Sequence, residues 1–140
     1  MKPVIKVDIV SDVVCPWCYI GKRRIEKAMQ SLADEFEFEI TYLPFELNPS
    51  VPKEGFDQKA YLVKKFGSEE KYNQITAHVS KVAAEEGLHF NFSKQQKSPN
   101  TKDAHRLLLY ARQQGKQIVL KELLMQAYFE KGIDLTQPTN

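Results

Sequence analysis

The stretch Cys15-Pro16-Trp17-Cys18 decides how the rest of the chain is interpreted, because it holds both cysteines and the only tryptophan. It ends an apolar strand pattern and begins a helix pattern. Proline at the first helical position costs nothing, since the N–H that it lacks would have no partner there. Cys15 would then cap the helix, and Cys18 would lie about one turn further along the same face. Cα atoms one turn apart fall within the roughly 4.4–6.8 Å that a disulfide tolerates, so the motif predicts a redox pair.

The composition is that of a folded protein. The chain has 140 residues, of which 42% are hydrophobic and 27% charged, enough for one globular domain or a small domain with an insertion. The formal net charge of +2 is too small to favour nucleic-acid binding without a basic face. The densest basic cluster, Lys22-Arg23-Arg24, is interpreted as a solvated helix face; the alternative is a field that favours thiolate at the motif.

Nothing in the sequence indicates export or a membrane span. Lys6 and Asp8 interrupt the apolar N-terminal segment, and no run approaches the roughly 18 apolar residues of a transmembrane helix. We therefore expect a cytoplasmic protein that binds neither membranes nor nucleic acid. In that compartment a lone C-x-x-C is typical of redox or metal chemistry rather than of a structural cross-link.

The first part of the chain follows a strand–helix–strand pattern. Alternating apolar residues predict a strand that ends near Ser11 and a second strand over residues 36–42. Between them, residues 16–33 carry apolar side chains at helical spacing, and Lys22 and Arg23 are expected to face water. The expected buried face of this helix consists of Ile25, Ala28, Met29 and Leu32. This unit predicts an α/β fold with parallel strands.

The rest of the chain is predicted to be mostly helical. Three prolines exclude helix from the connection at residues 44–52. Helix patterns follow, each ending at a glycine, at residues 57–66, 68–86, 101–114 and 117–131. In the last of these, the expected buried stripe consists of Leu120, Leu123, Leu124, Ala127 and Tyr128.

The two cysteines are expected to have unequal roles. A thiolate attacks disulfides whereas a thiol does so poorly, and a helix N-terminus stabilises thiolate at the capping position. We therefore predict that Cys15 has the lower pKa and forms the mixed disulfide with substrate. Cys18, inside the helix, would be less exposed, keep its proton longer and act as the resolving thiol.

A zinc site and an inert buried pair are the alternatives for the motif. Zinc needs two further ligands, and His78, His89 and His105 lie in different predicted elements without the spacing of a zinc site. No metal site is therefore expected. We expect His78 to pack at the boundary of its helix's buried face and His89 to be exposed, and His105 is kept as a candidate site residue.

Four separated segments extend the motif into a longer pattern. They are Ser11–Gly21, Pro44–Pro49, Asn100–Leu107 and Ala127–Phe129. Together they resemble the FrnE-like branch of the DsbA-type thioredoxin-fold oxidoreductases, relatives of the 2-hydroxychromene-2-carboxylate isomerases and kappa-class glutathione transferases. The resemblance implies a thioredoxin-like βαβ part at residues 1–52, a helical insertion at 53–132 and a connection back to the thioredoxin-like domain at 133–140. It also implies cytosolic thiol–disulfide exchange by Cys15 and Cys18.

The resemblance places substrate-binding residues around the cysteines. Those implied to border the active-site groove are Pro16, Trp17, Phe45, Asn48, Asn100 and His105. The residues alone leave a second interpretation open, in which Phe45 and Leu47 only anchor a loop. In the same way, Asn100 and Thr101 could only cap a helix, with Asp103 completing a capping box.

One part of the family pattern is not found in this chain. In the family, two antiparallel strands and a helix follow the insertion, opened by a loop whose cis-proline lies beside the reactive cysteine. We expect this C-terminal ββα half to be missing from the chain. The strand at residues 4–10 would then have an unpaired edge, and we predict that a second copy, or the missing piece, covers it.

The leading prediction is a thiol–disulfide oxidoreductase or isomerase. It would act on protein or small-molecule disulfides without a bound cofactor, and glutathione is the candidate reductant or co-substrate. The first alternative is a glutathione-dependent isomerase or transferase, although those relatives carry serine where this chain has Cys15. The second is a catalytically silent interaction protein that keeps the motif without the cis-proline half.

Overall fold

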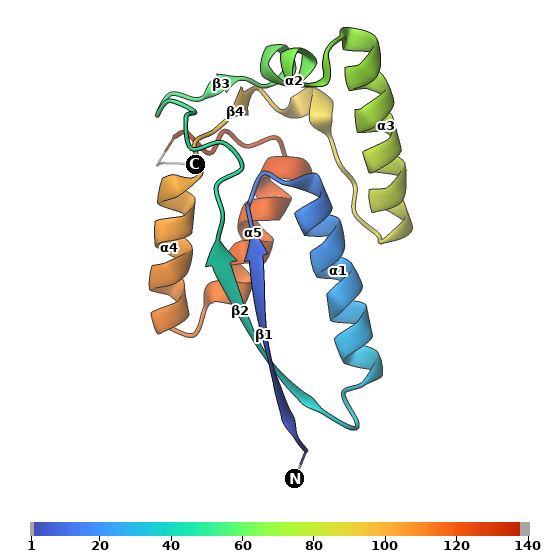
Figure 1. Cartoon of the computed structure of the whole chain (residues 1–140), viewed down its shortest axis with the longest axis vertical. Coiled ribbons are helices and arrows are strands. Elements are labelled where there is room, and N and C mark those ends of the chain that lie inside the picture. The colour runs from blue at the N-terminus through green and yellow to red at the C-terminus, as the bar shows by residue number, and fades with distance from the viewer. Residues whose placement is uncertain (1, 138–140) are drawn as a thin grey trace.

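The computed structural model describes residues 2–137 and contains a parallel strand pair surrounded by helices (Figure 1). In chain order the elements are β1 (Val4–Ser11), α1 (Pro16–Ser31), β2 (Glu37–Pro44), β3 (Phe56–Asp57), α2 (Gln58–Phe66), α3 (Glu69–Glu85), the 3₁₀ turn η1 (Phe92–Lys94), β4 (Lys97–Ser98), α4 (Lys102–Gln113) and α5 (Gln117–Phe129). The predicted βαβ start followed by helices is confirmed. Of the predicted connection at 133–140, residues 138–140 lie outside the described part.

The strands β1 and β2 pair in parallel, from Val4 opposite Glu37 to Ser11 opposite Pro44. Parallel neighbours need a crossover, which α1 supplies. The short strands β3 and β4 form a separate antiparallel pair. Figure 1 shows α2, α3 and this small pair beyond the carboxyl ends of β1 and β2, whereas α4 and α5 run alongside β2. The β1–α1 turn, which leads into the cysteines, therefore faces the helical segment.

Local capping explains why the helix boundaries agree with the sequence patterns to within a few residues. Asp57 caps α2 by accepting the Ala60 N–H at 3.0 Å, and Ser68 caps α3 by accepting the Lys71 N–H at 3.1 Å. Gly67 ends α2 with φ of 105°, a conformation that other residues rarely adopt. These signals are short-range, so the sequence carries them in full.

The hydrophobic core joins α1, α3 and α5 beside the cysteine motif. Its buried members are Tyr19, Ile20, Val79, Ala83, Leu88, Met125, Tyr128 and Phe129. Ring stacking extends the contact, with the centroids of Phe90 and Phe129 4.8 Å apart and those of Tyr19 and Phe90 5.9 Å apart. The first turns of α1 are thus held between the helical segment and α5, which gives the motif a rigid base.

The expected buried face of α1 is wrong in part. Ala28 is exposed and Leu32 is 40% exposed, because the C-terminal half of α1 extends past the elements that pack on its first turns. Lys22, expected to face water, is 3% exposed. It is buried because it pairs with the carboxylate of Glu122 on α5. The helical periodicity of the sequence does not show such a long-range pairing.

The expected stripe of α5 is also wrong in part. Leu123 is 54% exposed, and the buried face consists instead of Gln117, Lys121, Met125, Tyr128 and Phe129. Polar residues can lie there because they have partners. The Gln117 side chain accepts the Tyr42 N–H at 2.9 Å and donates to the Tyr42 carbonyl at 3.0 Å, as a neighbouring strand would.

Several apolar side chains of β1 are exposed to solvent in the described structure. Val4 is 48% exposed and Val10 is 60% exposed, although both belong to a strand rich in aliphatic residues. Association through this strand stays a prediction. None of the helices within residues 2–137 combines the length and the apolar character that crossing a bilayer requires.

Candidate redox site

Cys15 caps α1, as the motif predicts. Its backbone is extended, with φ of −90° and ψ of 113°, and Pro16 occupies the start of the helix. The Cys15 Sγ accepts the Cys18 N–H at 3.2 Å, and the Cys15 carbonyl accepts the same N–H at 3.1 Å. The sulfur therefore lies at the positive end of the helix, where negative charge is favoured.

The two cysteines differ in what surrounds them. Both side chains are half-buried. Within the described part of the chain, Cys18 packs against the hydrophobic core and Cys15 does not. Cys15 is thus the outer sulfur of the pair and Cys18 the inner one.

The two thiols interact directly and titrate together. A hydrogen bond from the Cys15 thiol lowers the pKa of Cys18 to about 6 despite the opposing effect of burial, and the Asp12 N–H and Ser11 hydroxyl contribute. The same hydrogen bond raises the pKa of Cys15, and burial raises it further. Because these shifts belong to the pair rather than to either thiol alone, the expectation that Cys15 has the lower pKa stays a prediction.

A buried cation lies behind the inner sulfur. Lys121 of α5 is 1% exposed, and its Nζ lies 5.2 Å above the ring of Tyr42. Within residues 2–137 it forms no ion pair with a carboxylate. Burial lowers the pKa of Lys121 to about 8, and the opposing charges of Cys18 and Asp12 limit that fall. Its charge is thus balanced by the redox pair and Asp12 rather than by a dedicated partner.

Asp12 anchors the turn that leads into Cys15. The carboxylate is 1% exposed and accepts hydrogen bonds from the Val13 N–H at 2.8 Å, from the Leu47 N–H at 2.8 Å and from His105 Nε2 at 3.0 Å. Burial alone would raise the pKa of Asp12, but the hydrogen bonds from His105, Leu47 and Thr101 hold it below its ordinary value. Asp12 therefore remains ionised and joins the β1–α1 turn to the loop at Leu47 and to the start of α4.

His105 is placed behind the site rather than on its surface. It is 5% exposed, and its Nε2 lies 3.0 Å from Asp12 Oδ1 and 3.1 Å from the Phe45 carbonyl. Both of these oxygens are acceptors, so Nε2 carries the proton and donates to them. The side chain thereby holds the start of α4 against the β1–α1 turn and the following loop.

Asn48 and Asn100 also use their polar atoms within the protein. Asn48 donates to the Tyr61 hydroxyl at 2.9 Å, and its carbonyl oxygen accepts the Ser50 N–H at 3.0 Å. Asn100 donates to the Val51 carbonyl at 2.8 Å, and its oxygen accepts the Lys102 N–H at 2.9 Å. Asn100 thus fastens the loop to the start of α4, while Asp103 pairs with Arg106 instead of completing a capping box.

Aromatic side chains remain exposed near the motif. Trp17 is 46% exposed and Phe45 is 51% exposed. The ring of His78 on α3 lies 6.1 Å from that of Trp17, and its side chain is exposed rather than packed at the boundary of the buried face as expected. His89 is exposed, as predicted. Trp17 and Phe45 are thus the candidate site residues that are free to touch another molecule.

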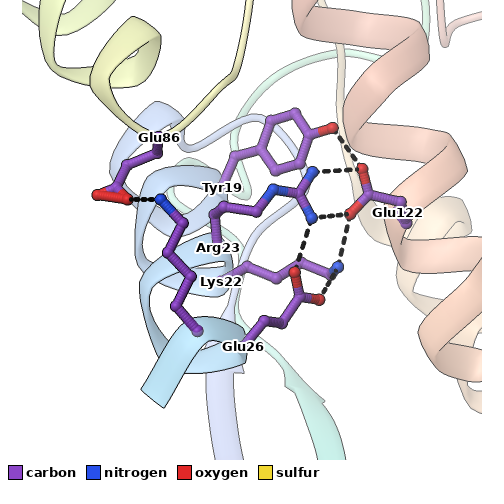
Figure 2. A network of polar contacts seen from close by, with 7 residues as sticks. Tyr19, Lys22, Arg23, Glu26, Glu86 and Glu122 are labelled. Carbon is purple, nitrogen blue, oxygen red and sulfur yellow. Dashed lines mark hydrogen bonds and ion pairs between the residues drawn. The ribbon is translucent and has the colours of Figure 1, made fainter. Parts of the chain in front are cut away.

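The basic cluster on α1 forms an ion-pair network with α5 (Figure 2). Glu122 accepts hydrogen bonds from Lys22 and Tyr19 at 2.6 Å each and from Arg23 at 2.9 Å. Glu26 on α1 also binds Lys22 and Arg23. Interpreting Lys22 and Arg23 as a solvated face is therefore wrong, and the network fixes α5, with Lys121, against the helix that carries the cysteines.

The motif did not point to three of the groups nearest the inner sulfur. Ser11 is 3% exposed, and its hydroxyl lies close enough to the Cys18 sulfur to lower the pKa of that thiol. Asp12 and Lys121 complete the set. The spacing of Lys121 in the sequence could have pointed to it. Lys121 lies four residues from both Gln117 and Met125, so the three share one face of α5, and that face is buried. Within the described residues, no three His, Cys, Asp or Glu side chains form a group that could hold a metal ion.

Comparison with known proteins agrees with this geometry. The family model for DsbA-like thioredoxin domains matches residues 6–140. The structure is similar to that of a probable DsbA oxidoreductase from Streptomyces coelicolor (SCO1869), with a TM-score of 0.83 and 31% identity, covering 93% of this chain and 56% of that one. A candidate protein disulfide isomerase from Nitrosomonas europaea shares the fold alone, at a TM-score of 0.58 and 20% identity over 99% of this chain and 61% of that one.

Among curated proteins, the chain is 30% identical over 99 residues to the YwbO protein of Bacillus subtilis, which is named as uncharacterised. The match covers 61% of this chain and 47% of that protein. The chain thus spans about half the length of the relatives that it matches. Since the family pattern extends over residues 6–140, the chain belongs to the family of DsbA-like thioredoxin domains.

Proposed function

We propose that this chain carries out thiol–disulfide exchange through Cys15 and Cys18. The observation that carries the proposal is the geometry of the pair. Cys15 Sγ sits at the N-terminus of α1 and accepts the Cys18 N–H at 3.2 Å, and Cys18 lies in the first turn of the same helix. Membership of the DsbA-like family supports the same chemistry.

In the proposed reaction Cys15 attacks first, because Cys18 faces the core. The Cys15 proton passes to Cys18 along the hydrogen bond between the thiols. The Cys15 thiolate then attacks one sulfur of the substrate disulfide, forms a mixed disulfide and releases the other substrate sulfur as a thiolate. Cys18 next loses its proton and attacks Cys15 Sγ, which releases the second substrate thiolate. The substrate gains two electrons and the cysteine pair loses two, and the reverse sequence oxidises a dithiol.

The groups behind Cys18 suit the second step. Once Cys15 is in the mixed disulfide, its thiol can no longer stabilise the Cys18 thiolate. The Asp12 N–H, the Ser11 hydroxyl and the charge of Lys121 still do so. We therefore assign to Lys121 and Ser11 the role of keeping Cys18 reactive when it must resolve the intermediate.

The other candidate residues divide into two groups. Pro16, Trp17 and Phe45 are proposed to contact substrate, since Trp17 and Phe45 keep exposed apolar surface near the cysteines. The proposed positioning residues are Asn48, Asn100 and His105. Their side chains already form hydrogen bonds within the protein, to Tyr61, to the Val51 carbonyl and to Asp12, respectively.

The proposed substrates are protein or small-molecule disulfides, with glutathione as the reductant that resets the pair and the cytoplasm as the location. Cysteine usage supports this, because both cysteines belong to one motif and none is left for a structural cross-link. Glutathione-dependent isomerisation stays the alternative, and Cys15 in place of serine argues against it.

Single cysteine variants test the proposal. With excess disulfide-bonded substrate such as scrambled ribonuclease, Cys18→Ser should accumulate a mixed disulfide on Cys15 that gel electrophoresis without reductant detects. Cys15→Ser should accumulate far less, and the double variant serves as the control. Trapping on Cys18 instead would reverse the roles, and wild-type exchange no faster than that of the double variant would leave the silent-protein interpretation.

A further inference from the structure

An apolar cavity of about 120 Å³ lies on one side of the cysteine motif. The β1–α1 turn and the start of α1 contribute Val14 and Pro16 to its wall, and α2 and α3 contribute Phe66 and Val79. An apolar cavity of about 150 Å³ can take up a molecule the size of benzene, so this space suits a single ring or a short branched chain.

One polar group in the wall has no partner. Gln95 is 7% exposed and lines the cavity. Its Oε1 accepts a hydrogen bond from Gln58 at 3.0 Å, whereas its Nε2 has no hydrogen-bond partner among residues 2–137. Buried polar groups nearly always form hydrogen bonds, so an acceptor placed in the cavity next to this N–H group would be favourable.

The Gln95 amide ends a chain of buried hydrogen bonds. The Tyr72 hydroxyl donates to Gln58 Oε1 at 3.1 Å, and the Gln58 amino group donates to Gln95 Oε1 at 3.0 Å. Gln58 is 1% exposed and Tyr72 is 6% exposed, so the network is held in a packed environment. The amino group of Gln95 is therefore the end left available for another molecule.

The charges in the wall favour a neutral ligand. Asp12 and Lys65 are the charged residues that line the cavity, and Asp12 is buried whereas Lys65 is exposed to water. A carboxylate placed inside would lie near the Asp12 charge in an apolar setting, which costs free energy. A carbonyl oxygen accepts the Gln95 N–H without that cost.

We propose that this cavity binds a small neutral apolar molecule whose carbonyl oxygen accepts a hydrogen bond from Gln95 Nε2. Because Pro16 forms part of the wall, the bound molecule lies next to the redox motif. The proposal concerns binding alone and stands independently of thiol exchange.

Three ligands of similar size test it by ¹⁵N–¹H NMR titration of the whole chain. Cyclopentanone has a neutral acceptor, methylenecyclopentane has the same shape without one, and cyclobutanecarboxylate carries a charge. We expect cyclopentanone to shift the Gln95 side-chain amide signal and to bind about five-fold more tightly than methylenecyclopentane, the ratio typical of one hydrogen bond. Cyclobutanecarboxylate should bind more weakly than cyclopentanone.

Variants separate the hydrogen bond from the shape of the cavity. Gln95→Leu should bring the affinities for cyclopentanone and methylenecyclopentane together, whereas Gln96→Leu, at an exposed neighbour, should keep the five-fold difference. Equal affinities in the wild type, tighter binding of cyclobutanecarboxylate, or no shifts near the cavity with any ligand would overturn the proposal, and these readouts need no folded Gln95→Leu. Repeating the titration with the Cys15→Ser, Cys18→Ser double variant keeps a failure of binding distinct from a failure of the redox function.

Discussion

His105 Nε2 lies 3.0 Å from Asp12 Oδ1, and this contact joins the first turn of α4 to the segment that leads into Cys15. The second Asp12 oxygen accepts the Leu47 N–H, and His105 Nε2 also reaches the Phe45 carbonyl. One buried acid and one buried histidine therefore set the relative position of the cysteine turn, the following loop and α4.

Replacing His105 should destabilise the fold. His105→Leu removes the hydrogen bond from His105 to the buried Asp12 carboxylate, which should cost about 3 kcal/mol of the free energy of unfolding. His105→Gln, which can still donate, should cost less. Urea unfolding at pH 7 measures both, and Asp103→Ala, in an exposed ion pair, should change stability by less than about 0.5 kcal/mol. A loss for His105→Leu no larger than that of the control would contradict the assigned role.

The effect of His105→Leu should depend on pH. The folded pKa of Asp12 lies below its ordinary value of 3.8, so folding favours the carboxylate. This stabilisation is complete above the ordinary pKa and is lost as the pH falls through the folded value. The difference between wild type and His105→Leu should thus shrink as the pH falls below 4.

The thiol pair should ionise below the pH of an ordinary cysteine. Because the Cys15 thiol stabilises the Cys18 thiolate and lowers the pKa of Cys18 to about 6, absorbance at 240 nm should show one thiolate forming near that pH. Cys15→Ala removes the donor, so the pKa of Cys18 should rise toward that of a free thiol, about 8.5. A first ionisation at or above that value in the wild type would exclude stabilisation of one thiolate by the other thiol.

Replacing Lys121 should stabilise the protein and slow the reaction. Burial lowers the pKa of Lys121 to about 8, so at pH 7 the folded state carries an unfavourable buried charge. Lys121→Met should remove it and raise the free energy of unfolding by roughly 1 to 3 kcal/mol, since one pKa unit corresponds to about 1.4 kcal/mol. In the wild type alone, stability should rise between pH 8 and 10.5, where the unfolded chain binds more protons.

The kinetic effect of Lys121→Met should fall on the resolving step. Decay of a preformed mixed disulfide on Cys15 should slow several-fold at pH 7, and raising the pH should restore the rate because it ionises Cys18 directly. Lys131→Met, at an exposed lysine just beyond α5, should change neither stability nor rate. An unchanged decay rate in Lys121→Met would remove this residue from the mechanism.

The network at Glu122 should hold α5 against α1. Burial would raise the pKa of Glu122, but hydrogen bonds from Arg23, Lys22 and Tyr19 lower it to about 2. Glu122→Gln should cost about 1 to 2 kcal/mol at low salt, allowing for screening of partly exposed groups. The stabilisation should be complete above pH 4.5 and disappear as the pH falls toward 2. Glu69→Gln is the control, since Glu69 and Lys59 form an exposed pair whose loss should not be measurable.

We propose that β1 supplies the surface through which this chain associates with a second copy. Val10, which is 60% exposed, lies on the strand whose edge is open within the described residues. Sedimentation velocity should show a concentration-dependent dimer, and Val10→Lys should shift it to monomer. A stable monomer at all concentrations would argue against this association.

Local chemistry explains which features were predictable. The cap at Cys15 follows from proline at the next position, and the helix ends follow from Asp57, Ser68 and Gly67. The parallel strands follow from alternation on both sides of one helix. All of these depend on neighbours within a few residues, which a single sequence displays.

The buried faces of α1 and α5 and the charge on the cysteine pair depend on pairings between distant segments. Lys22 is buried because Glu122, far along the chain, accepts from it, and Leu123 is exposed because Gln117 and Lys121 occupy the packed side of α5. The charge on the cysteine pair depends in the same way on Lys121. Amphipathic periodicity treats such polar residues as solvated and therefore assigns the wrong face.

The amide of Gln117 has a consequence for how the sheet can grow. By binding both the N–H and the carbonyl of Tyr42, it occupies the C-terminal part of the edge of β2 that faces away from β1. A further strand cannot be added there without displacing it. Any extension of this sheet, by another segment or another molecule, must therefore proceed from the side of β1.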